Sequence, residues 1–541
     1  MANHSDQDSS VSAIPSRSRW SRRGFLRAGM SASLTAPLLL NGGRLAAEDR
    51  RGEALDSASS FGTAKDRLDQ GPFPITQDEG WMTLAVTTPT KEHIRNFGLG
   101  LVGYTWEENG PALRVRNGKQ SLADAVERMA SLPFVDVLYI RCDWRNVQSQ
   151  PGKLDLNPVF DLTRDAARRH NLKFAFRIQL SNPEFEPQQL ALPDFVREQV
   201  PLVPIGKMHY RGRATEFVEP RYDHPAFQRA FRELNELLAA KFDGDPLLEW
   251  MDLMQYGFWG ESHTNNLPNP FPNFYTAEQT FLHMTQFQLD TWKKTQLAVN
   301  TEPDISGVGN NQVRDLAMRN GCWPRSDSIV VEEPIQIDQL ANRPPWLAAI
   351  MEDGAYRQYD LSHMPIDAAG VPERENAMLH VLDLGANYWA LWTEAENLEA
   401  YNEKYPEGFR ALQQRMGYRI RPAWVWQRKR WGTEEVIVAV ANDGVSGFPG
   451  VLRLTLENAD GSIRASGTLD LGQPYGGRIR EASLILPPGL GAVDMKLTAQ
   501  LETKAGVARK VRWACQQPLD SDGAFPIKLM APNDPKWRKG I

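Results

Sequence analysis

The sequence has few of the residues and motifs on which several large classes of enzyme depend. It contains three cysteines, Cys142, Cys322 and Cys515, and this odd number at wide spacing argues against a disulfide framework and against a cysteine-based metal site. It has no histidine pair at metal-ligand spacing, no phosphate-cradling glycine loop and no nucleophile elbow. We therefore expect no metal and no cofactor, and metallohydrolase, kinase and esterase activities are disfavoured.

A concentrated basic face is also missing. The formal net charge is -6, and phosphate binding needs clustered Lys and Arg, so nucleic acid is not an expected partner. Tryptophan, in contrast, is abundant, with 16 residues whose faces suit sugar rings but also suit a protein core. The 541 residues, 41% of them hydrophobic, are enough for one large barrel and an accessory module.

Residues 1–48 resemble a twin-arginine export signal. A polar start is followed by Ser-Arg-Arg-Gly-Phe-Leu-Arg from Ser21 to Arg27, by a modest apolar run to Leu40 and by small residues around Ala47. A transmembrane anchor is the alternative, but the apolar run is about half of the ~20 residues that a span needs. We expect cleavage near Ala47, an exported protein in the periplasm or the medium without membrane attachment, and a linker over residues 49–90.

Between residues 91 and 417, apolar strand-like runs alternate with amphipathic helices, which is typical of a parallel α/β architecture. The expected strands are 97–106, 135–144, 173–180, 249–261, 296–302, 322–332, 346–352 and 386–392. Helical periodicity falls between them, for example over 122–132, 158–170 and 225–241. This pattern predicts a (β/α)8 TIM barrel. Residues 182–223 have many prolines and no clean period, and we expect a long loop that forms one wall of the site.

Two glutamates at expected strand ends are the candidates for catalysis. Glu261 ends the fourth strand after Gly257 and Gly260, and barrel active sites are built at the C-terminal ends of strands. A solvated strand-end glutamate is the alternative. Glu352 ends the seventh expected strand. Three other residues also follow strand-like runs and are rivals to Glu352: Glu302, Glu332 and Glu333.

Further candidates for substrate binding lie at the same strand ends. Arg141 and Arg177 could bind an anionic sugar substituent, or they could pair with Asp143 or another barrel carboxylate. His263 could contact substrate or line a loop. Five tryptophans could stack on sugar rings or pack in the core: Trp106, Trp144, Trp259, Trp389 and Trp392. Asp143, Gln179 and Glu302 complete the predicted substrate-binding set.

Five short motifs resemble those of clan-A-type glycoside hydrolase barrels, and in particular poorly characterised families related to family 42 β-galactosidases. They are Arg141-Cys-Asp-Trp144, Phe176-Arg-Ile178, Trp259-Gly-Glu261, Met351-Glu352 and Tyr388-Trp-Ala-Leu-Trp392. The resemblance covers about residues 95–540 and implies Glu261 as acid/base and Glu352 as nucleophile. The clan usually has Asn before the acid/base residue, and here Gly260 stands there. Either another residue binds the sugar's 2-hydroxyl or the strand-four carboxylate has a different role.

Residues 418–541 change to short alternating runs separated by Gly, Asn and Asp, which predicts an all-β sandwich. The whole pattern predicts an exported glycoside hydrolase acting on an oligo- or polysaccharide. A non-catalytic carbohydrate-binding barrel is the first alternative, because a fold by itself does not assign catalysis. A barrel lyase, which would need a Tyr or His base, is the second.

Overall fold

The computed structural model describes residues 80–107, 110–111, 120–184, 190–210, 213–262, 271–301, 310–326, 334–353, 373–430, 432–474, 479–531 and 534. These residues all belong to one compact unit. The expected export signal and four of the predicted site residues lie outside the described ranges: His263, Glu302, Glu332 and Glu333. Within these ranges, no helix combines the length and the apolar character needed to cross a membrane.

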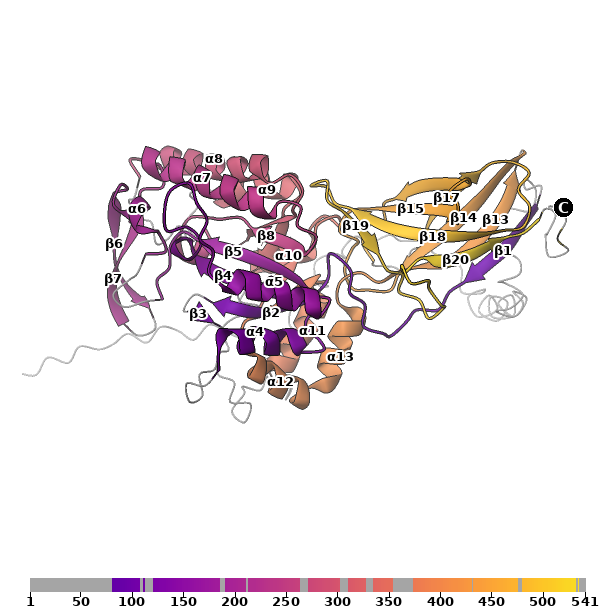
Figure 1. Cartoon of the computed structure of the whole chain (residues 1–541), viewed down its shortest axis with the longest axis horizontal. Coiled ribbons are helices and arrows are strands. Elements are labelled where there is room, and N and C mark those ends of the chain that lie inside the picture. Colours follow the sequence, from indigo (N-terminus) through magenta and orange to yellow (C-terminus); the bar gives the residue numbers. More distant parts are fainter. Residues whose placement is uncertain are drawn as a thin grey trace, which may run out of the picture. The chain divides into compact units, whose positions relative to one another are not determined.

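Eight parallel strands form a closed barrel, as the sequence predicts, and four of them, β2, β4, β5 and β8, are labelled in Figure 1. In the order of their pairing they are β2 (Gly100–Glu107), β4 (Val137–Asp143), β5 (Lys173–Gln179), β8 (Leu248–Asp252), β9 (Leu297–Asn300), β10 (Trp323–Ser326), β11 (Ile350–Glu352) and β12 (Tyr388–Leu391). β12 pairs in parallel with β2 and closes the ring. All eight expected strands are therefore present, and the (β/α)8 prediction is confirmed.

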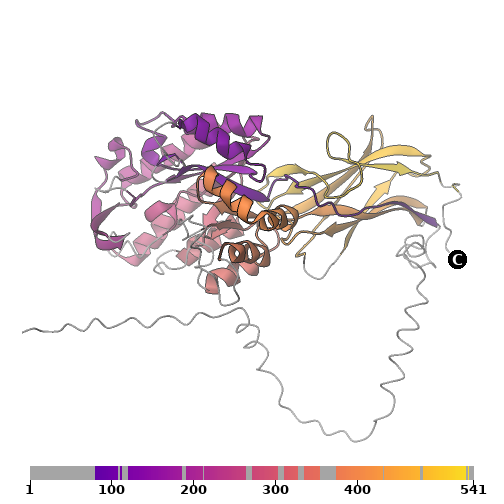
Figure 2. The ribbon, with the colours of Figure 1, turned by 90° about the horizontal axis from the view of Figure 1, so that it is seen from below.

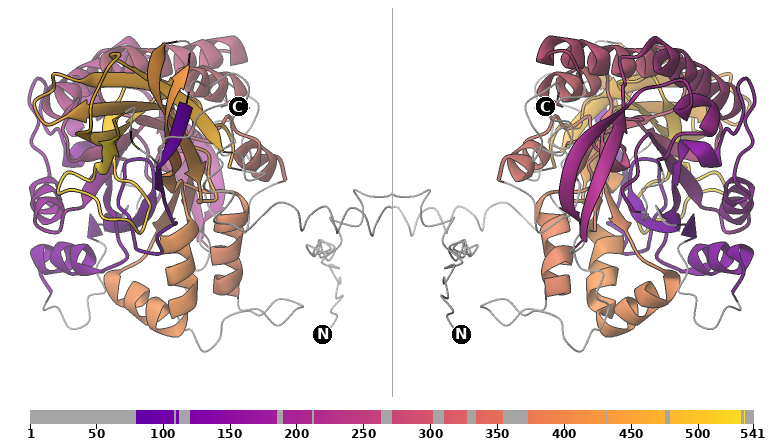
Figure 3. Two further views of the ribbon diagram at one scale, coloured as in Figure 1. Left: turned by 90° about the vertical axis from the view of Figure 1, so that its right-hand side faces the viewer. Right: turned by 90° about the vertical axis from the view of Figure 1, so that its left-hand side faces the viewer.

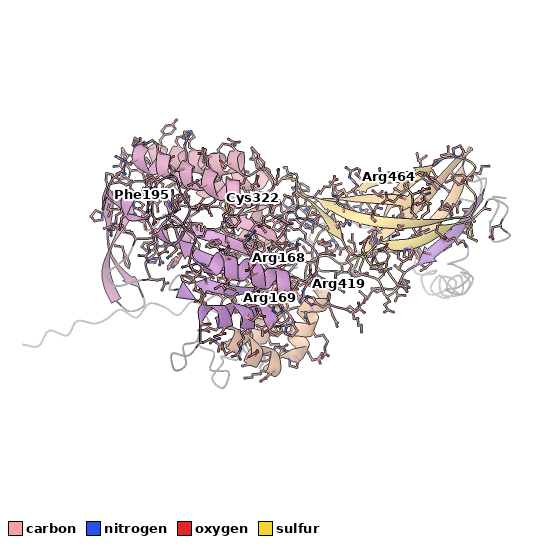
Figure 4. The ribbon with its side chains drawn as sticks, in the orientation of Figure 1. Arg168, Arg169, Phe195, Cys322, Arg419 and Arg464 are labelled. Carbon is pink, nitrogen blue, oxygen red and sulfur yellow. The ribbon has the colours of Figure 1, made fainter. Side chains whose placement is uncertain are left out.

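Helices pack around the outside of these strands (Figure 3). They are α4 (Leu122–Ser131), α5 (Val159–Arg169), α7 (Pro225–Phe242), α8 (Phe274–Thr291), α9 (Asn310–Arg319), α10 (Pro334–Ala341), α11 (Glu373–Asp383), α12 (Ala395–Lys404) and α13 (Pro406–Arg415). A capping box between Ser121 and Asp124 starts α4, whose buried face includes Val126 and Met129. Charged residues occupy the outer faces, as with Arg168 and Arg169 on α5 (Figure 4).

The alternation of side chains along the strands determines what reaches the barrel interior. On β4, Leu138, Ile140 and Cys142 belong to the hydrophobic cluster beneath the helices, whereas Val137 and Tyr139 belong to the interior cluster. The next residue on the inner face is Arg141. β4 thus carries apolar residues inward near its start and a polar residue inward near its end, where a barrel's site is built.

Aromatic side chains fill the N-terminal end of the barrel. The rings of Trp250 and Tyr388 are 4.8 Å apart, and those of Trp323 and Tyr388 are 5.7 Å apart. Below them, Glu249 accepts hydrogen bonds from the Tyr388 hydroxyl (2.6 Å) and the Gly98 amide (3.1 Å). This end of the barrel is packed with side chains, which leaves the C-terminal end as the place for a site.

Part of the region 182–223 is regular structure, so the expectation of one long structureless loop is wrong. It contains the short helix α6 (Asp194–Arg197) and an antiparallel hairpin of β6 (Leu202–Tyr210) and β7 (Arg213–Pro220), visible in the foreground of the right-hand view in Figure 3. Ser181 donates a hydrogen bond of 2.6 Å to Glu219, which ties β7 to the end of β5. Backbone hydrogen bonds between β6 and β7 form a regular structure that the hydrophobic pattern of this region does not predict.

The C-terminal region forms two antiparallel sheets, which confirms the predicted β-sandwich (Figure 2). One contains β1 (Gly80–Val86), β13 (Ile420–Arg430), β14 (Thr433–Asn442) and β17 (Arg480–Leu486). The other contains β15 (Val451–Asn458), β16 (Arg464–Leu469), β18 (Val493–Glu502), β19 (Ala508–Val511) and β20 (Phe525–Leu529). β1 comes from the range expected to be linker, and it pairs along β13 with Trp81 buried beside Trp426. Residues 80–86 are therefore part of the sandwich.

The three cysteines are buried free thiols. Cys322 precedes β10 in the barrel (Figure 4). Over the described part of the chain, no group of three or more His, Cys, Asp or Glu side chains is arranged to hold a metal ion.

Candidate active site

Glu261 does not end the fourth strand, which stops at Asp252. The chain continues through a 3-10 turn, Phe258–Gly260, and returns against β5, where the Trp259 amide donates a 3.0 Å hydrogen bond to the Ser181 carbonyl. Gly257 and Gly260 have φ angles of 78° and 69°, a backbone conformation that glycine adopts more readily than any other residue. Glu261 is therefore carried by a tight loop beyond the strand, and this loop places it over the barrel axis.

The backbone on both sides of Glu261 is in a conformation that side chains disfavour. Trp259 has φ 57° and Ser262 has φ 66°, and Asn171 is the one other non-glycine residue with positive φ in the described chain. Such residues cost on the order of 1–3 kcal/mol each and concentrate at functional sites. The strain around Glu261 thus supports a functional role for this loop.

Glu261 and Glu352 meet over a single arginine. The Arg141 Nη1 atom lies 3.0 Å from Glu261 Oε1 and 3.1 Å from Glu352 Oε1, so the two oxygens are at most about 6.1 Å apart. Glu261 is 3% exposed and Glu352 is 1% exposed. The two carboxylates that the sequence predicts as a pair are therefore neighbours at the C-terminal end of the barrel.

Glu352 has two further partners on its two oxygens. The Tyr104 hydroxyl donates a 2.8 Å hydrogen bond to Oε1, and Arg325 Nη2 lies 2.6 Å from Oε2. Burial raises the pKa of Glu352, but the guanidinium groups of Arg325 and Arg141 outweigh this effect, so the pKa lies below its ordinary value. Glu352 is therefore held as a carboxylate.

Glu261 is bound by two guanidinium groups through the same oxygen. Arg177 Nη1 lies 2.6 Å from Oε1, and the same nitrogen donates a 3.3 Å hydrogen bond to the Trp259 carbonyl. Arg177 therefore holds both the Glu261 side chain and the backbone of its loop. Arg141 and Arg177 follow the ion-pair interpretation of the sequence, since both contact barrel carboxylates.

Asp252 is a third carboxylate inside the barrel. It accepts a hydrogen bond from the Tyr139 hydroxyl and lies 3.6 Å from Arg325 and 3.9 Å from Arg177. In the described part of the barrel, these contacts link three arginines with three carboxylates, and the formal charges of the six cancel. This ion network consists of Arg141, Arg177, Arg325, Asp252, Glu261 and Glu352. Its members are each at most 3% exposed, so removing any one of them leaves a buried partner uncompensated.

Asp143 ends β4 near the rim of the barrel. It accepts a 2.8 Å hydrogen bond from the Asn182 side chain and lies 2.8 Å from Arg145 Nη2. Burial raises its pKa from 3.8 to about 6, because these two partners compensate only part of the lost hydration. Asp143 therefore changes charge close to neutral pH.

The raised pKa of Asp143 predicts a pH-dependent cost to folding. The unfolded chain releases this proton near pH 4 and the folded chain near pH 6, so stability falls as pH rises through this interval and then levels off. The Asp143→Asn variant lacks this loss. We expect the free energy of unfolding of the variant, minus that of the wild type, to increase by on the order of 3 kcal/mol between pH 4 and pH 7. Denaturant titrations at four pH values measure it, and a difference independent of pH would contradict the raised pKa.

The five predicted tryptophans divide between the site and the core. Trp392 lies at the site, where the Arg141 guanidinium is 5.0 Å from its ring centroid. Trp259 is half-buried on the Glu261 loop, and its indole nitrogen donates a 3.3 Å hydrogen bond to Glu184. Trp106 is half-buried and packs on the cluster beneath the helices. Trp144 and Trp389 are fully buried in that same cluster, so for these two the core interpretation applies.

Sequence reasoning missed four residues of the site. They are Tyr104, Tyr139, Asp252 and Arg325. Tyr104 and Arg325 contact Glu352, and Tyr139 and Asp252 contact each other and Arg325. A signal was present, because each is a polar residue on the inner-facing side of an expected strand. Gln179, which was predicted, is buried at the end of β5 beside Asp143 in the strand register.

No family model matches the chain, and no curated protein matches it. Solved structures similar to it include the catalytic domain of a β-amylase from Paenibacillus polymyxa, at 10% identity over 56% of this chain and 94% of that chain, with a TM-score of 0.36. An endogalactoceramidase is similar at 14% identity over 76% and 99%, with a TM-score of 0.37. Endo-glycoceramidase II from Rhodococcus sp., solved as a lactosyl-enzyme intermediate, is similar at 12% over 75% and 100%, with a TM-score of 0.34. Similarity this distant assigns no activity to the chain.

Proposed function

We propose that this protein is an exported glycoside hydrolase of the clan-A type that cleaves an oligo- or polysaccharide with retention of anomeric configuration. The observation that carries the proposal is the glutamate pair held by Arg141 at the C-terminal end of the barrel. Retaining enzymes place their carboxyl groups about 5–5.5 Å apart and inverting enzymes about 6.5–9.5 Å. The two oxygens that share Arg141 Nη1 are at most about 6.1 Å apart, which is below the inverting range and supports retention.

Glu352 is the nucleophile in this proposal. Its lowered pKa keeps it ionised, and the Tyr104 hydroxyl and Arg325 hold its orientation. A fixed carboxylate can attack the anomeric carbon at once, because no proton has to leave it first. The positive charge of Arg141 and Arg325 also offsets the charge of Glu352 before the glycosyl-enzyme ester forms.

Glu261 is the acid/base in this proposal. Both guanidinium groups contact its Oε1 atom, so the proton for the leaving oxygen would be carried on Oε2. Gly260 offers no side chain for the sugar's 2-hydroxyl, and another group at the rim has to supply that contact.

A carbohydrate-binding barrel without catalysis is the second candidate, and one observation favours it. Two arginines on Glu261 stabilise its ionised form, and a proton donor must be protonated when substrate arrives. In a binding protein the same ion network would only stabilise the C-terminal end of the barrel, where the sugar binds.

Hydrolysis by the mature chain separates the two candidates. A panel of aryl glycosides and plant or marine oligosaccharides should contain a substrate that wild type cleaves, and the first product should keep the anomeric configuration of the substrate. Glu261→Gln should slow cleavage about 10²–10⁴-fold for poor leaving groups and much less for activated aryl groups, which need no proton. The exposed Glu127→Gln on α4 should leave the rate unchanged. Binding of sugars without any cleavage would favour the second candidate.

A further inference from the structure

Gln179 is a buried amide that the structure leaves without partners. It is the last residue of β5, its side chain is 0% exposed, and it pairs in register with Asp143 on β4. Among the described residues, neither its Oε1 nor its Nε2 atom has a hydrogen-bond partner. Buried polar groups are nearly always satisfied, and the exceptions call for an explanation.

The strand geometry directs this amide toward the barrel axis. Phe174, Phe176 and Ile178 lie in the cluster beneath the helices, whereas Ala175 lies in the interior cluster and Arg177 reaches Glu261. Gln179 follows on the same face as Arg177 because side chains alternate along a strand. It therefore lies one layer above the arginine that holds the proposed acid/base.

Polar residues and an aromatic residue lie near Gln179 at the end of β5. Asp143 and Asn182 form a hydrogen-bonded pair next to it, and Trp259 lies on the loop that packs against the end of β5. An amide presents one acceptor and two donors in a plane, and hydroxyl groups on adjacent ring carbons both donate and accept. A leucine at this position would bury the same volume without any unmet hydrogen bond.

We propose that Gln179 binds two adjacent hydroxyl groups of the sugar ring held at the glutamate pair, and that it thereby selects among sugars by hydroxyl configuration. This inference rests on the proposed glycoside hydrolase function and adds a specificity residue to it. A site built to hydrogen-bond a hydroxyl strongly rejects the analogue that lacks it, because the buried amide is then left unpaired.

Gln179→Leu tests this assignment with two readouts. For the best glycoside of the panel, we expect kcat/KM to fall about 10- to 100-fold, which corresponds to the loss of two hydrogen bonds. For the monodeoxy analogue that lacks a contacted hydroxyl, wild type and variant should differ far less. The melting temperature of Gln179→Leu should equal or exceed that of wild type, because no protein hydrogen bond is lost.

Gln296→Leu is the matched control. Gln296 is also buried, but it lies before β9, and its Nε2 atom donates to the carbonyls of Leu297 (2.9 Å) and Gly321 (2.8 Å). We expect a lower melting temperature and an unchanged preference between glycosides. If Gln179→Leu instead lowers the melting temperature as Gln296→Leu does, or slows all glycosides and deoxy analogues equally, the amide has a structural role and the proposal is overturned.

Failure of the enzymatic function is distinguishable from failure of this assignment. If wild type cleaves nothing but panel sugars raise its melting temperature, the hydrolase proposal fails. The proposed sugar-binding role of Gln179 is then supported if Gln179→Leu abolishes the increase in melting temperature. It is overturned if the increase persists. If the panel sugars are neither cleaved nor bound, both proposals are overturned.

Discussion

Replacing Glu352 with glutamine should abolish most of the hydrolytic activity, with a fall in kcat on the order of 10⁴-fold. The amide is nearly the same size but cannot form the glycosyl-enzyme ester, whereas the carboxylate is held ready by Tyr104, Arg141 and Arg325. Steady-state rates with the best aryl glycoside measure the loss. Mass spectrometry of wild type after incubation with a slow fluorinated glycoside should find the sugar on the peptide that contains Glu352.

Glu249→Gln is the matched control for this result. Glu249 is a buried glutamate as well, but it lies at the N-terminal end of the barrel. There it accepts hydrogen bonds from the Tyr388 hydroxyl and the Gly98 amide. Its substitution should leave kcat unchanged. Full activity in Glu352→Gln would contradict the assignment and transfer the second carboxylate to Glu302, Glu332 or Glu333.

Replacing Arg325 with methionine should destabilise the fold by about 3–5 kcal/mol. The Arg325 side chain is 0% exposed and lies 2.6 Å from Glu352 and 3.6 Å from Asp252, so its removal leaves two buried carboxylates without a main counter-charge. The double variant Arg325→Met/Glu352→Gln should recover part of this loss, because one of the uncompensated charges is gone. Denaturant titration at pH 7 measures the free energies of unfolding of the wild type, of Arg325→Met and of the double variant.

Arg319→Met provides the comparison for a solvent-exposed ion pair. Arg319 on α9 lies 2.9 Å from Asp315, but both side chains are more than half exposed, and such pairs contribute at most about 1 kcal/mol. Equal losses in Arg325→Met and Arg319→Met would show that the ion network does not stabilise the barrel. No recovery in the double variant would show that Arg325 acts by packing and not by charge.

Most of the architecture can be predicted from the sequence because it depends on local patterns. Eight apolar runs separated by helical periodicity specify the barrel strands, and short alternating runs specify the sandwich. The same reasoning missed the β6–β7 hairpin, because its strands lack a clear period, and it placed β1 in a linker. The partner strand of β1, β13, is more than 300 residues away, and no local pattern contains that pairing.

The amino-acid sequence by itself determined that several glutamates follow strand-like runs. It predicted Glu261, which also follows Gly257 and Gly260, and Glu352 as the pair, with Glu302, Glu332 and Glu333 as rivals to Glu352. Only the tertiary structure decided what surrounds them. Arg141, Arg177 and Arg325 come from three different strands and meet at the glutamates because closure of the barrel turns the ends of those strands toward one axis. The tertiary structure also decided that Trp144 packs in the core and that Trp392 lies at the site. The burial of a side chain depends on neighbours that are distant in the chain.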